Sequence, residues 1–356
     1  MSNLYSRFKV FHYKEKLDSL PESTAQARPP LHIRLKPTNF CNQNCWYCAY
    51  RRDEIQLGKD MDTRSRIPRG KMLELIDDFV EMGVKAITFS GGGEPLCYPH
   101  LGEALTRLSA SGIRFASLTN GVLLHGAIAD LFAHQGTWIR VSMDGWDPDS
   151  YAAYRNVLPT EYGKVMGNLE SFKKLGGQCF LSVVVNIDKA NASHVYEIIR
   201  KLNTVGVDSI KIAPCIISND ITGNHEYHKG IFPIVQDQVL AAVSDFSSEK
   251  FEISNGYKEQ LVTFAKEYHW CPSIQITPVI GADLNVYSCQ DKAYNLTCGV
   301  ICSIQNKRFK DAWPADKRQF FTINPKRDCN HHCVANEKNL MILEYLEVDK
   351  KHLEFV

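Results

Sequence analysis

The alternation of short apolar runs with helix-like segments constrains the fold of this chain more than any other feature of its sequence. Six β-branched and apolar runs occur, at residues 31–36, 84–90, 113–120, 138–144, 179–187 and 208–214. Segments of helical periodicity separate them, at 70–83, 99–110, 122–134, 162–175 and 191–205. Near-continuous apolar strands joined through helices predict parallel βα units with both faces of the sheet covered.

Six βα units are too few for a closed eight-fold barrel. We therefore predict an α/β fold, a partial (β/α)6 TIM-like barrel that stays open, with its chemistry at the carboxyl ends of the strands. Segment 70–83 illustrates the predicted packing. Its apolar face toward the sheet consists of Met72, Ile76, Phe79 and Val80, and its polar face of Asp77, Asp78 and Glu81.

The βα rhythm ends near residue 215, and the sequence predicts three regions. Residues 1–30 form an N-terminal extension, 31–250 the partial barrel, and 251–356 a smaller C-terminal unit. A helix is expected around 230–248 and a short strand at 251–254. The remaining segment is loop-rich and contains six of the twelve cysteines, so it needs a cross-link or a metal to stand as a folded unit.

Charge and composition exclude several classes of protein. Lys and Arg total 41 and Asp and Glu total 40, so no bulk field favours nucleic acid or a membrane surface. No apolar run reaches the ~20 residues of a membrane span, and the N-terminus lacks signal-peptide features. We expect a cytoplasmic protein. Disulfides are rare there, so its cysteines are either buried thiols or metal ligands.

Three of these cysteines form a C-x3-C-x2-C array directly after the first strand: Cys41, Cys45 and Cys48. A short loop can bring three thiolates to one metal centre. Three ligands leave one iron of a cubane 4Fe-4S cluster open. A zinc knuckle completed by a distant fourth ligand is the alternative for this spacing.

The array, with the aromatic Tyr47 just before its last cysteine, resembles the signature of the radical S-adenosylmethionine (radical SAM) superfamily. The resemblance implies a 4Fe-4S cluster whose open iron chelates S-adenosylmethionine. One-electron reduction then gives a 5′-deoxyadenosyl radical that abstracts a hydrogen atom from a substrate. The cofactor carries out the difficult chemistry, and the protein positions and shields it.

Further segments resemble motifs of the same superfamily. SGGGEP resembles its GGE motif, TNG recurs after the third strand, VSMDG resembles VSLDG, and YRN resembles YRG. The resemblance implies that these motifs contact S-adenosylmethionine through Gly92, Gly93, Glu94, Asn120, Ser142, Asp144 and Arg155. The alternatives are a glycine-rich turn, helix caps at Ser142 and Asp144, and a solvated charge at Arg155.

A second group of cysteines frames the C-terminal unit: Cys271, Cys289, Cys329 and Cys333. We interpret the segment as a strand opened by Cys271, a hairpin, and a return strand closed by Cys289. The pattern resembles the twitch or SPASM extension of radical SAM enzymes, which implies an auxiliary 4Fe-4S cluster. Cys298 or Cys302 can replace a ligand, and a zinc ribbon is the alternative. We expect His331 and His332, between the last two cysteines, to face solvent.

Two further cysteines follow strands at the expected cavity. Cys97 and Cys215 are candidate donors of a hydrogen atom to a product radical, or else small buried apolar side chains. Cys179 lies at the opposite end of its strand and is assigned to the core.

The sequence favours an oxidoreductase acting on a small molecule such as a sugar, an aminocyclitol or a nucleotide derivative. No segment for cobalamin precedes Cys41, and the N-terminal extension is short for a leader-binding domain. We expect a flavodoxin or ferredoxin as electron donor and the auxiliary cluster as electron acceptor. Alternatives are modification of a ribosomally made peptide, a redox-neutral elimination, and a non-enzymatic zinc-binding scaffold.

Overall fold

The computed structural model describes residues 6–25, 27–55, 57–257, 261, 264–313 and 316–355. These residues contain a ten-stranded sheet of order β10-β9-β8-β1-β2-β3-β4-β5-β6-β7. The strands are β1 (His32–Leu35), β2 (Ala86–Phe89), β3 (Arg114–Thr119), β4 (Trp138–Ser142), β5 (Phe180–Ile187), β6 (Ser209–Pro214), β7 (Glu252–Asn255), β8 (Val279–Ile280), β9 (Asn285–Tyr287) and β10 (Val300–Ser303).

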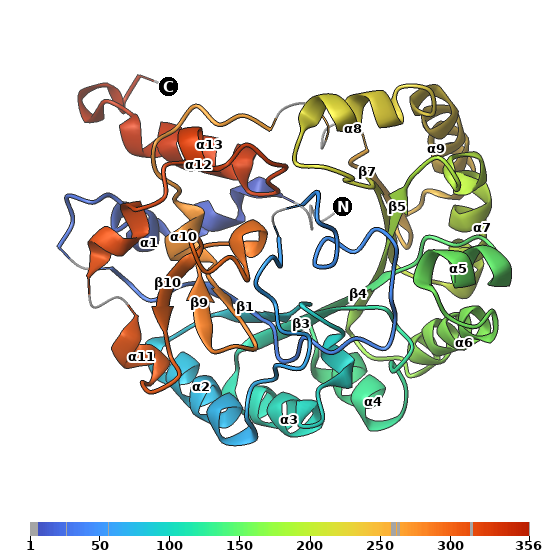
Figure 1. Cartoon of the computed structure of the whole chain (residues 1–356), viewed down its shortest axis with the longest axis horizontal. Helices are drawn as coiled ribbons and strands as arrows, with labels where there is room; N and C mark the ends of the chain where they lie inside the picture. The colour runs from blue at the N-terminus through green and yellow to red at the C-terminus, as the bar shows by residue number, and fades with distance from the viewer. Residues whose placement is uncertain are drawn as a thin grey trace.

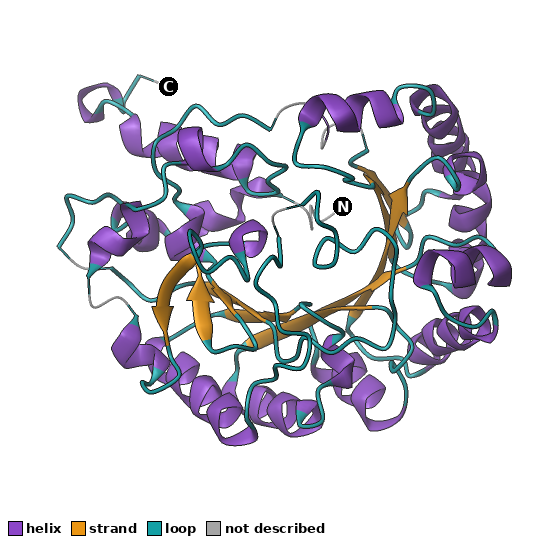
Figure 2. Cartoon of the chain, in the orientation of Figure 1, coloured by secondary structure: helices purple, strands orange, loops and turns teal. Residues whose placement is uncertain are grey.

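The helices between the barrel strands lie on the outer, convex side of this curved sheet, whereas the helices near the two termini gather at its β8–β10 end (Figures 1 and 2). The structure describes thirteen α-helices. They are α1 (Lys14–Asp18), α2 (Arg69–Met82), α3 (Leu101–Ser111), α4 (Gly126–Gln135), α5 (Pro148–Arg155), α6 (Thr160–Lys174), α7 (Val195–Val205), α8 (Ile221–His228), α9 (Phe232–Phe246), α10 (Ser273–Ile276), α11 (Phe309–Ala312), α12 (Pro325–Asp328) and α13 (Asn336–Glu347). None of the described helices has the length and apolarity to cross a bilayer.

The predicted open barrel is confirmed. β1 to β6 coincide with the six predicted runs, and each pairs in parallel with the next. The short strand expected at 251–254 is β7, which pairs in parallel with β6 and adds a seventh strand to the barrel. A division of domains at residue 250 therefore cuts through one continuous sheet, and it stays a prediction.

The C-terminal segment joins the sheet at its other edge. β8 pairs in parallel with β1, and β9 and β10 continue the sheet as antiparallel strands. One detail of the prediction was wrong, because Cys271 precedes the short helix α10 and β8 begins only at Val279. This arrangement brings the cysteine-rich segment to the start of the barrel, next to the strand that leads into the Cys41 loop.

The predicted faces of α2 needed correction. Leu75 belongs to its buried face, whereas Val80 is exposed. Asp78 was expected in solvent but is fully buried, because its carboxylate accepts hydrogen bonds from Arg308 Nε at 2.8 Å and from the Lys310 amide at 3.4 Å. A buried carboxylate is tolerated when it is paired in this way. Asp78 thereby docks the C-terminal helix α11 against the barrel.

Candidate functional site

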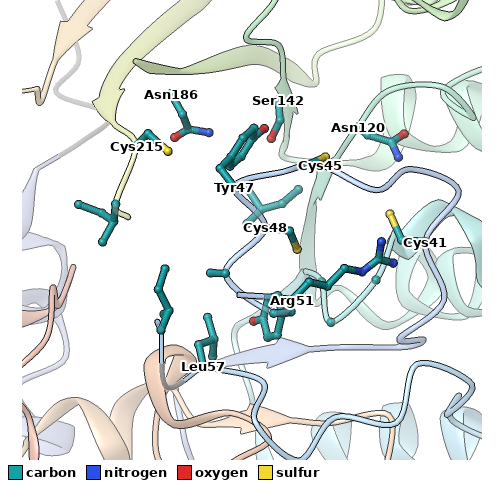
Figure 3. A pocket seen from close by; sticks show the side chains of 18 of the residues that line it. Cys41, Cys45, Tyr47, Cys48, Arg51, Leu57, Asn120, Ser142, Asn186 and Cys215 are labelled. Atoms are coloured by element: carbon teal, nitrogen blue, oxygen red, sulfur yellow. The ribbon is translucent and has the colours of Figure 1, made fainter. Parts of the chain in front are cut away.

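The three cysteines of the first array lie on the loop between β1 and α2. Cys41, Cys45 and Cys48 all line one cavity of about 450 Å³ (Figure 3). The end of α5 holds the loop in place, since the amide of Asn44 donates to Arg155 O at 3.0 Å and the amide of Trp46 to Tyr154 O at 3.3 Å. The array is thus anchored over the carboxyl ends of the strands.

The ends of successive barrel strands form the rest of the cavity wall. The segments that follow or close β2 to β6 contribute Gly92, Gly93, Glu94, Asn120, Ser142, Asn186 and Cys215. Figure 3 shows Asn120, Ser142, Asn186 and Cys215 around the cysteine loop. Ligands and catalytic groups occupy this end of the strands in open and closed α/β barrels.

The glycines of the SGGGEP turn permit a close approach to the cysteine loop. A Cβ atom on Gly93 would meet Phe40 O at 2.0 Å, and one on Gly92 would meet Asn39 Oδ1 at 2.1 Å. The turn is also hydrogen-bonded to the loop, from Gly93 N to Thr38 O at 3.1 Å and from Glu94 N to Phe40 O at 2.8 Å. Any larger residue would push the array away from the strand ends.

Glu94 is almost fully buried, and its carboxylate is already engaged by the protein. It accepts from Thr119 Oγ1 at 2.6 Å, from the Asn120 amide at 2.7 Å and from the Leu96 amide at 3.0 Å. Burial raises the pKa of Glu94, and these three hydrogen bonds oppose that rise. The carboxylate therefore ties the GGE turn to the TNG turn as well as lining the cavity.

Asp144 and Arg155 form a buried pair beneath the cysteine array. Arg155 Nη2 lies 2.5 Å from Asp144 Oδ2, and Arg155 Nη1 donates to Cys45 Sγ at 3.4 Å. Tyr47 donates to the same carboxylate, and the Asn186 amide donates to its other oxygen at 2.7 Å. Burial raises the pKa of Asp144, and the guanidinium opposes this rise.

The two residues lie differently with respect to the cavity. Arg155 lines the cavity, but Asp144 is not among the described residues that do, and all of its closest partners are protein groups. Ser142, at the end of the same strand, remains the nearer candidate for a ribose contact. Asp144 is not a solvent-exposed helix cap, and Arg155 is not a solvated charge, because both side chains are buried.

The two candidate hydrogen donors occupy different places. Cys215 is buried and lines the main cavity, and burial raises the pKa of its thiol. Cys97 lies in the 3-10 turn Pro95–Cys97 and lines a second hollow, which shares Cys41 and Arg51 with the main cavity. Cys179 is in the core cluster, as predicted.

The four C-terminal cysteines influence one another electrostatically. Burial raises the pKa of the Cys289 thiol, and Asp291, Cys333, Cys271 and Cys329 raise it further. Burial also raises the pKa of Cys302, to about 11, but no other thiol contributes to that shift. Cys298 is exposed and lies 3.8 Å from Lys292 Nζ. This mutual influence is in line with the predicted set Cys271, Cys289, Cys329 and Cys333, which stays a prediction.

The prediction for the two histidines was wrong. His331 is only 5% exposed, and both His331 and His332 line the main cavity. Lys266, itself buried, donates to His331 O at 2.9 Å and so turns the loop between Cys329 and Cys333 inward. Asp291, two residues after Cys289, lines the same wall. The C-terminal cysteine segment thus forms one wall of the barrel cavity.

The donor sets suit iron–sulfur clusters. All twelve cysteines are free thiols, and burial raises the pKa of Cys41 to about 12. Metal binding must therefore displace protons from these thiols. Among the described residues no three His, Cys, Asp or Glu side chains already converge on one metal position. Three thiols on one loop, and four thiols of the C-terminal segment that influence one another, nonetheless supply the ligand atoms that such clusters require.

Sequence reasoning missed Asn186, Asp291, His331 and His332 as wall residues. Asn186 follows the inward alternation of β5 and could have been found from its position near the end of that strand. The other three lie in segments without regular periodicity, so their direction depends on tertiary contacts such as the one from Lys266.

Comparison with known proteins identifies the domain. The family model of the radical SAM superfamily matches residues 35–202. A GTP 3′,8-cyclase of Rhizobium leguminosarum bv. trifolii is 29% identical over 196 residues, which are 54% of this chain and 53% of that protein. The chain thus spans only about half the length of this relative.

Solved structures share the fold at low sequence identity. Streptococcus suis SuiB bound to the precursor peptide SuiA has a TM-score of 0.58 and 16% identity, covering 80% of this chain and 64% of SuiB. Native anSMEcpe with bound AdoMet has a TM-score of 0.57 and 18% identity, covering 82% of this chain and 82% of that one. Residues 35–202, a little under half of the chain, thus match the radical SAM superfamily.

Proposed function

We propose that the chain binds a 4Fe-4S cluster through Cys41, Cys45 and Cys48, and S-adenosylmethionine in the cavity beside it. The observation that carries this proposal is that all three thiols and the GGE turn line the same cavity. When bound, such a cluster supplies one electron that splits S-adenosylmethionine into methionine and a 5′-deoxyadenosyl radical.

Different residues of the cavity would bind different groups of S-adenosylmethionine. Ser142, Asn186 and Asn120 offer hydroxyl and amide groups at the strand ends, where a ribose and an amino acid tail need partners. Glu94 holds the two turns in register and offers negative charge to an ammonium group. Arg155 offers a cation to the thiolate of Cys45.

We infer a second 4Fe-4S cluster on Cys271, Cys289, Cys329 and Cys333. Asp291, His331 and His332, which come from the same segment, line the main cavity, so this cluster would border the substrate. This position supports an oxidation. If a substrate carbon lost a hydrogen atom there, a cluster held by these four cysteines would offer an acceptor for the second electron, and loss of a proton would complete a two-electron oxidation.

The proposed substrate is a small molecule, namely a sugar, an aminocyclitol or a nucleotide derivative. The GTP 3′,8-cyclase relative supports a nucleotide, and a cavity of about 450 Å³ is in the range of small-molecule sites. Twelve free thiols suit a reducing, cytoplasmic compartment.

Metal analysis and S-adenosylmethionine cleavage test the proposal together. The protein would be purified without oxygen, reconstituted, and assayed for iron, sulfide and 5′-deoxyadenosine. We expect about eight irons per chain for two cubane clusters, and about four after replacing Cys41, Cys45 and Cys48 with alanine. Cleavage should be lost in that variant and retained in Cys298→Ala, whose thiol is exposed.

Two outcomes would contradict the proposal. Zinc in place of iron, without cleavage, would leave a metal-stapled scaffold. Equal cleavage by the triple variant would place the reductive centre elsewhere in the chain.

A further inference from the structure

Two buried lysines lie beside the four cysteines of the C-terminal segment. Lys266 and Lys292 are each only 2% exposed, and lysines are rarely buried to this extent without a partner. Lys266 lies before α10, and Lys292 ends the 3-10 turn Gln290–Lys292 that follows Cys289. The cost of burying two ammonium groups has to be offset by hydrogen bonds and by nearby negative charge.

Backbone carbonyl groups next to the predicted ligands hold both ammonium groups. Lys266 Nζ donates to His331 O at 2.9 Å, in the loop between the last two cysteines. Lys292 Nζ donates to Asp328 O at 2.6 Å, and Asp328 directly precedes Cys329. The two positive charges are therefore fixed against the segment that carries the last two cysteines.

The lysines and the thiols influence each other electrostatically. Burial lowers the pKa of Lys266, and three of the four predicted ligands, together with Asp291, oppose this shift. Burial raises the pKa of Cys329 to about 11, and Lys292 and Lys266 both oppose this rise. The charges of both lysines thus act on the sulfur atoms that would hold a cluster.

Cys271, at the other end of the set, is also surrounded by groups that stabilise negative charge on sulfur. The fully buried Asn339 donates from Nδ2 to Cys271 Sγ at 3.2 Å. Burial raises the pKa of Cys271, whereas hydrogen bonds from the backbone and from Asn339, and the charge of Lys338 on α13, oppose this rise. Hydrogen bonds and cations therefore reach the set from several elements.

The carboxylates near these cysteines are themselves compensated by cations. Burial raises the pKa of Asp291 to about 6, and Arg34, followed by three lysines, opposes this rise. Asp328 forms an ion pair with Arg327 at 2.7 Å. The buried lysines are therefore not simply cancelled by neighbouring acids, and their charge remains to act on the thiols.

We propose that Lys266 and Lys292 raise the reduction potential of a cluster held by these four cysteines, an inference that rests on the proposed function. A cubane with four thiolate ligands is negatively charged, and reduction adds a further negative charge. Fixed cations beside it stabilise the reduced state more than the oxidised state. Neither lysine is among the described residues that line the main cavity, so both act on the substrate through the cluster.

A raised potential serves the oxidation proposed above. In that step the substrate radical is oxidised by one electron, which passes to the cluster, and the substrate proton passes to water. The transfer becomes more favourable as the potential of the acceptor rises. Charge and hydrogen bonds to sulfur are the means by which a protein sets this potential.

The test measures the potential of the auxiliary cluster by itself. In a full-length background protein in which Cys41, Cys45 and Cys48 are replaced by alanine, reconstitution should leave about four irons per chain. Iron content is measured first in every variant, so that loss of the cluster is separated from a change in its potential. An EPR-monitored redox titration then gives the midpoint potential.

The variants separate the charge of the lysines from their structural contacts. Lys266→Met and Lys292→Met each remove one charge, whereas Lys266→Arg keeps it. The matched control is Lys16→Met, because Lys16 is also buried, at 4% exposed, and also donates to a backbone carbonyl, Arg28 O, at 2.6 Å. Its lowered pKa results from burial and from two neighbouring cations, not from thiols.

We expect each of the methionine variants of Lys266 and Lys292 to shift the reduction equilibrium about tenfold toward the oxidised cluster. For one electron this corresponds to a fall of about 59 mV in the midpoint potential. Lys266→Arg and Lys16→Met should stay within about threefold of the background protein, because both retain the two charges beside the cysteines.

Three results would overturn the inference. The first is an unchanged potential in both Lys266→Met and Lys292→Met. The second is an equal fall in Lys266→Met and Lys266→Arg, and the third is loss of iron from both methionine variants, since each would assign the lysines a structural role. A background protein that holds no iron would instead contradict the auxiliary cluster of the proposed function, so the two failures are distinguishable.

Discussion

Arg155 and Asp144 are joined by a buried ion pair, 2.5 Å between Nη2 and Oδ2, directly beneath the cysteine array. The side chain of Asp144 is fully buried, and that of Arg155 is 4% exposed. The second nitrogen of the same guanidinium donates to Cys45 Sγ. The pair therefore connects the end of β4 to a predicted cluster ligand, and two predictions follow from its geometry.

Replacing one partner of this pair should destabilise the fold. Asp144→Asn leaves the buried guanidinium without a counter-charge, which costs about 3–5 kcal/mol in the free energy of unfolding. Denaturant unfolding of the metal-free protein measures this loss. The matched control is Glu170→Gln, which breaks the exposed pair with Lys174 and should cost less than about 1 kcal/mol. Equal losses of unfolding free energy in Asp144→Asn and Glu170→Gln would contradict the claim that burial makes the Asp144–Arg155 pair more costly to break.

Arg155 should also raise the reduction potential of the Cys41 cluster. A cationic donor to a ligand sulfur stabilises the more negative, reduced state. Arg155→Met should lower the midpoint potential on the order of 50 mV, the one-electron equivalent of about 1 kcal/mol. An EPR-monitored redox titration, in which added S-adenosylmethionine identifies the signal of this cluster, checks the shift. Arg107→Met, which removes an exposed guanidinium paired with Asp77 on the outer helices, is the control and should leave the potential unchanged.

Measurements of iron content can distinguish the cysteines that ligate the auxiliary cluster from the cysteines that do not. Cys289→Ala should lose about four irons per chain, because it removes one of four mutually influencing thiols. Cys302→Ala should retain them, because no other thiol affects Cys302. Cys289→Ala should still cleave S-adenosylmethionine at its first cluster. If Cys302→Ala also lost four irons, the ligand set would have to be revised.

The barrel could be predicted from the sequence because its signals are local. Six apolar runs and the helical periodicity between them needed no tertiary information, and all six strands lie where the runs predicted. The helix α5 was missed although its signal is present, since Asp147 and Ser150 form a capping box with Pro148 at the first turn. Asp78 could not have been placed, because its burial depends on Arg308, far away in the chain.

The residues of the site also fall into those that the sequence predicts and those that it does not. Cys41, Cys45 and Cys48 follow a strand, so their place at the carboxyl ends was predictable from topology. The inward turn of His331 was not, because it depends on the contact from Lys266. Asp144 was expected to face the cofactor, but its carboxylate points to Arg155, Tyr47 and the Asn186 amide. Motif spacing identifies a residue, but it does not show which neighbouring group will pair with its charged side chain.

A buried lysine far from the cavity predicts a pH dependence of stability. Lys16 is 4% exposed, its ammonium donates to Arg28 O at 2.6 Å, and burial lowers its pKa to about 7, with Lys317 and Arg28 adding to the shift. Between pH 7 and 10.5 the unfolded chain keeps the proton that the folded chain has lost. The unfolded state then binds more protons, so this residue makes stability rise with pH in that window.

Lys16→Met removes this contribution and should flatten the profile. The difference in unfolding free energy between wild type and variant should change by on the order of 1 kcal/mol per pH unit between about pH 7.5 and 9, in favour of wild type as pH rises. Below about pH 6 both states of wild type hold the proton, so the difference should be constant. Denaturant unfolding at several pH values measures it, with the exposed Lys14→Met as control. Parallel profiles for wild type and Lys16→Met would show that the amine stays charged inside the fold.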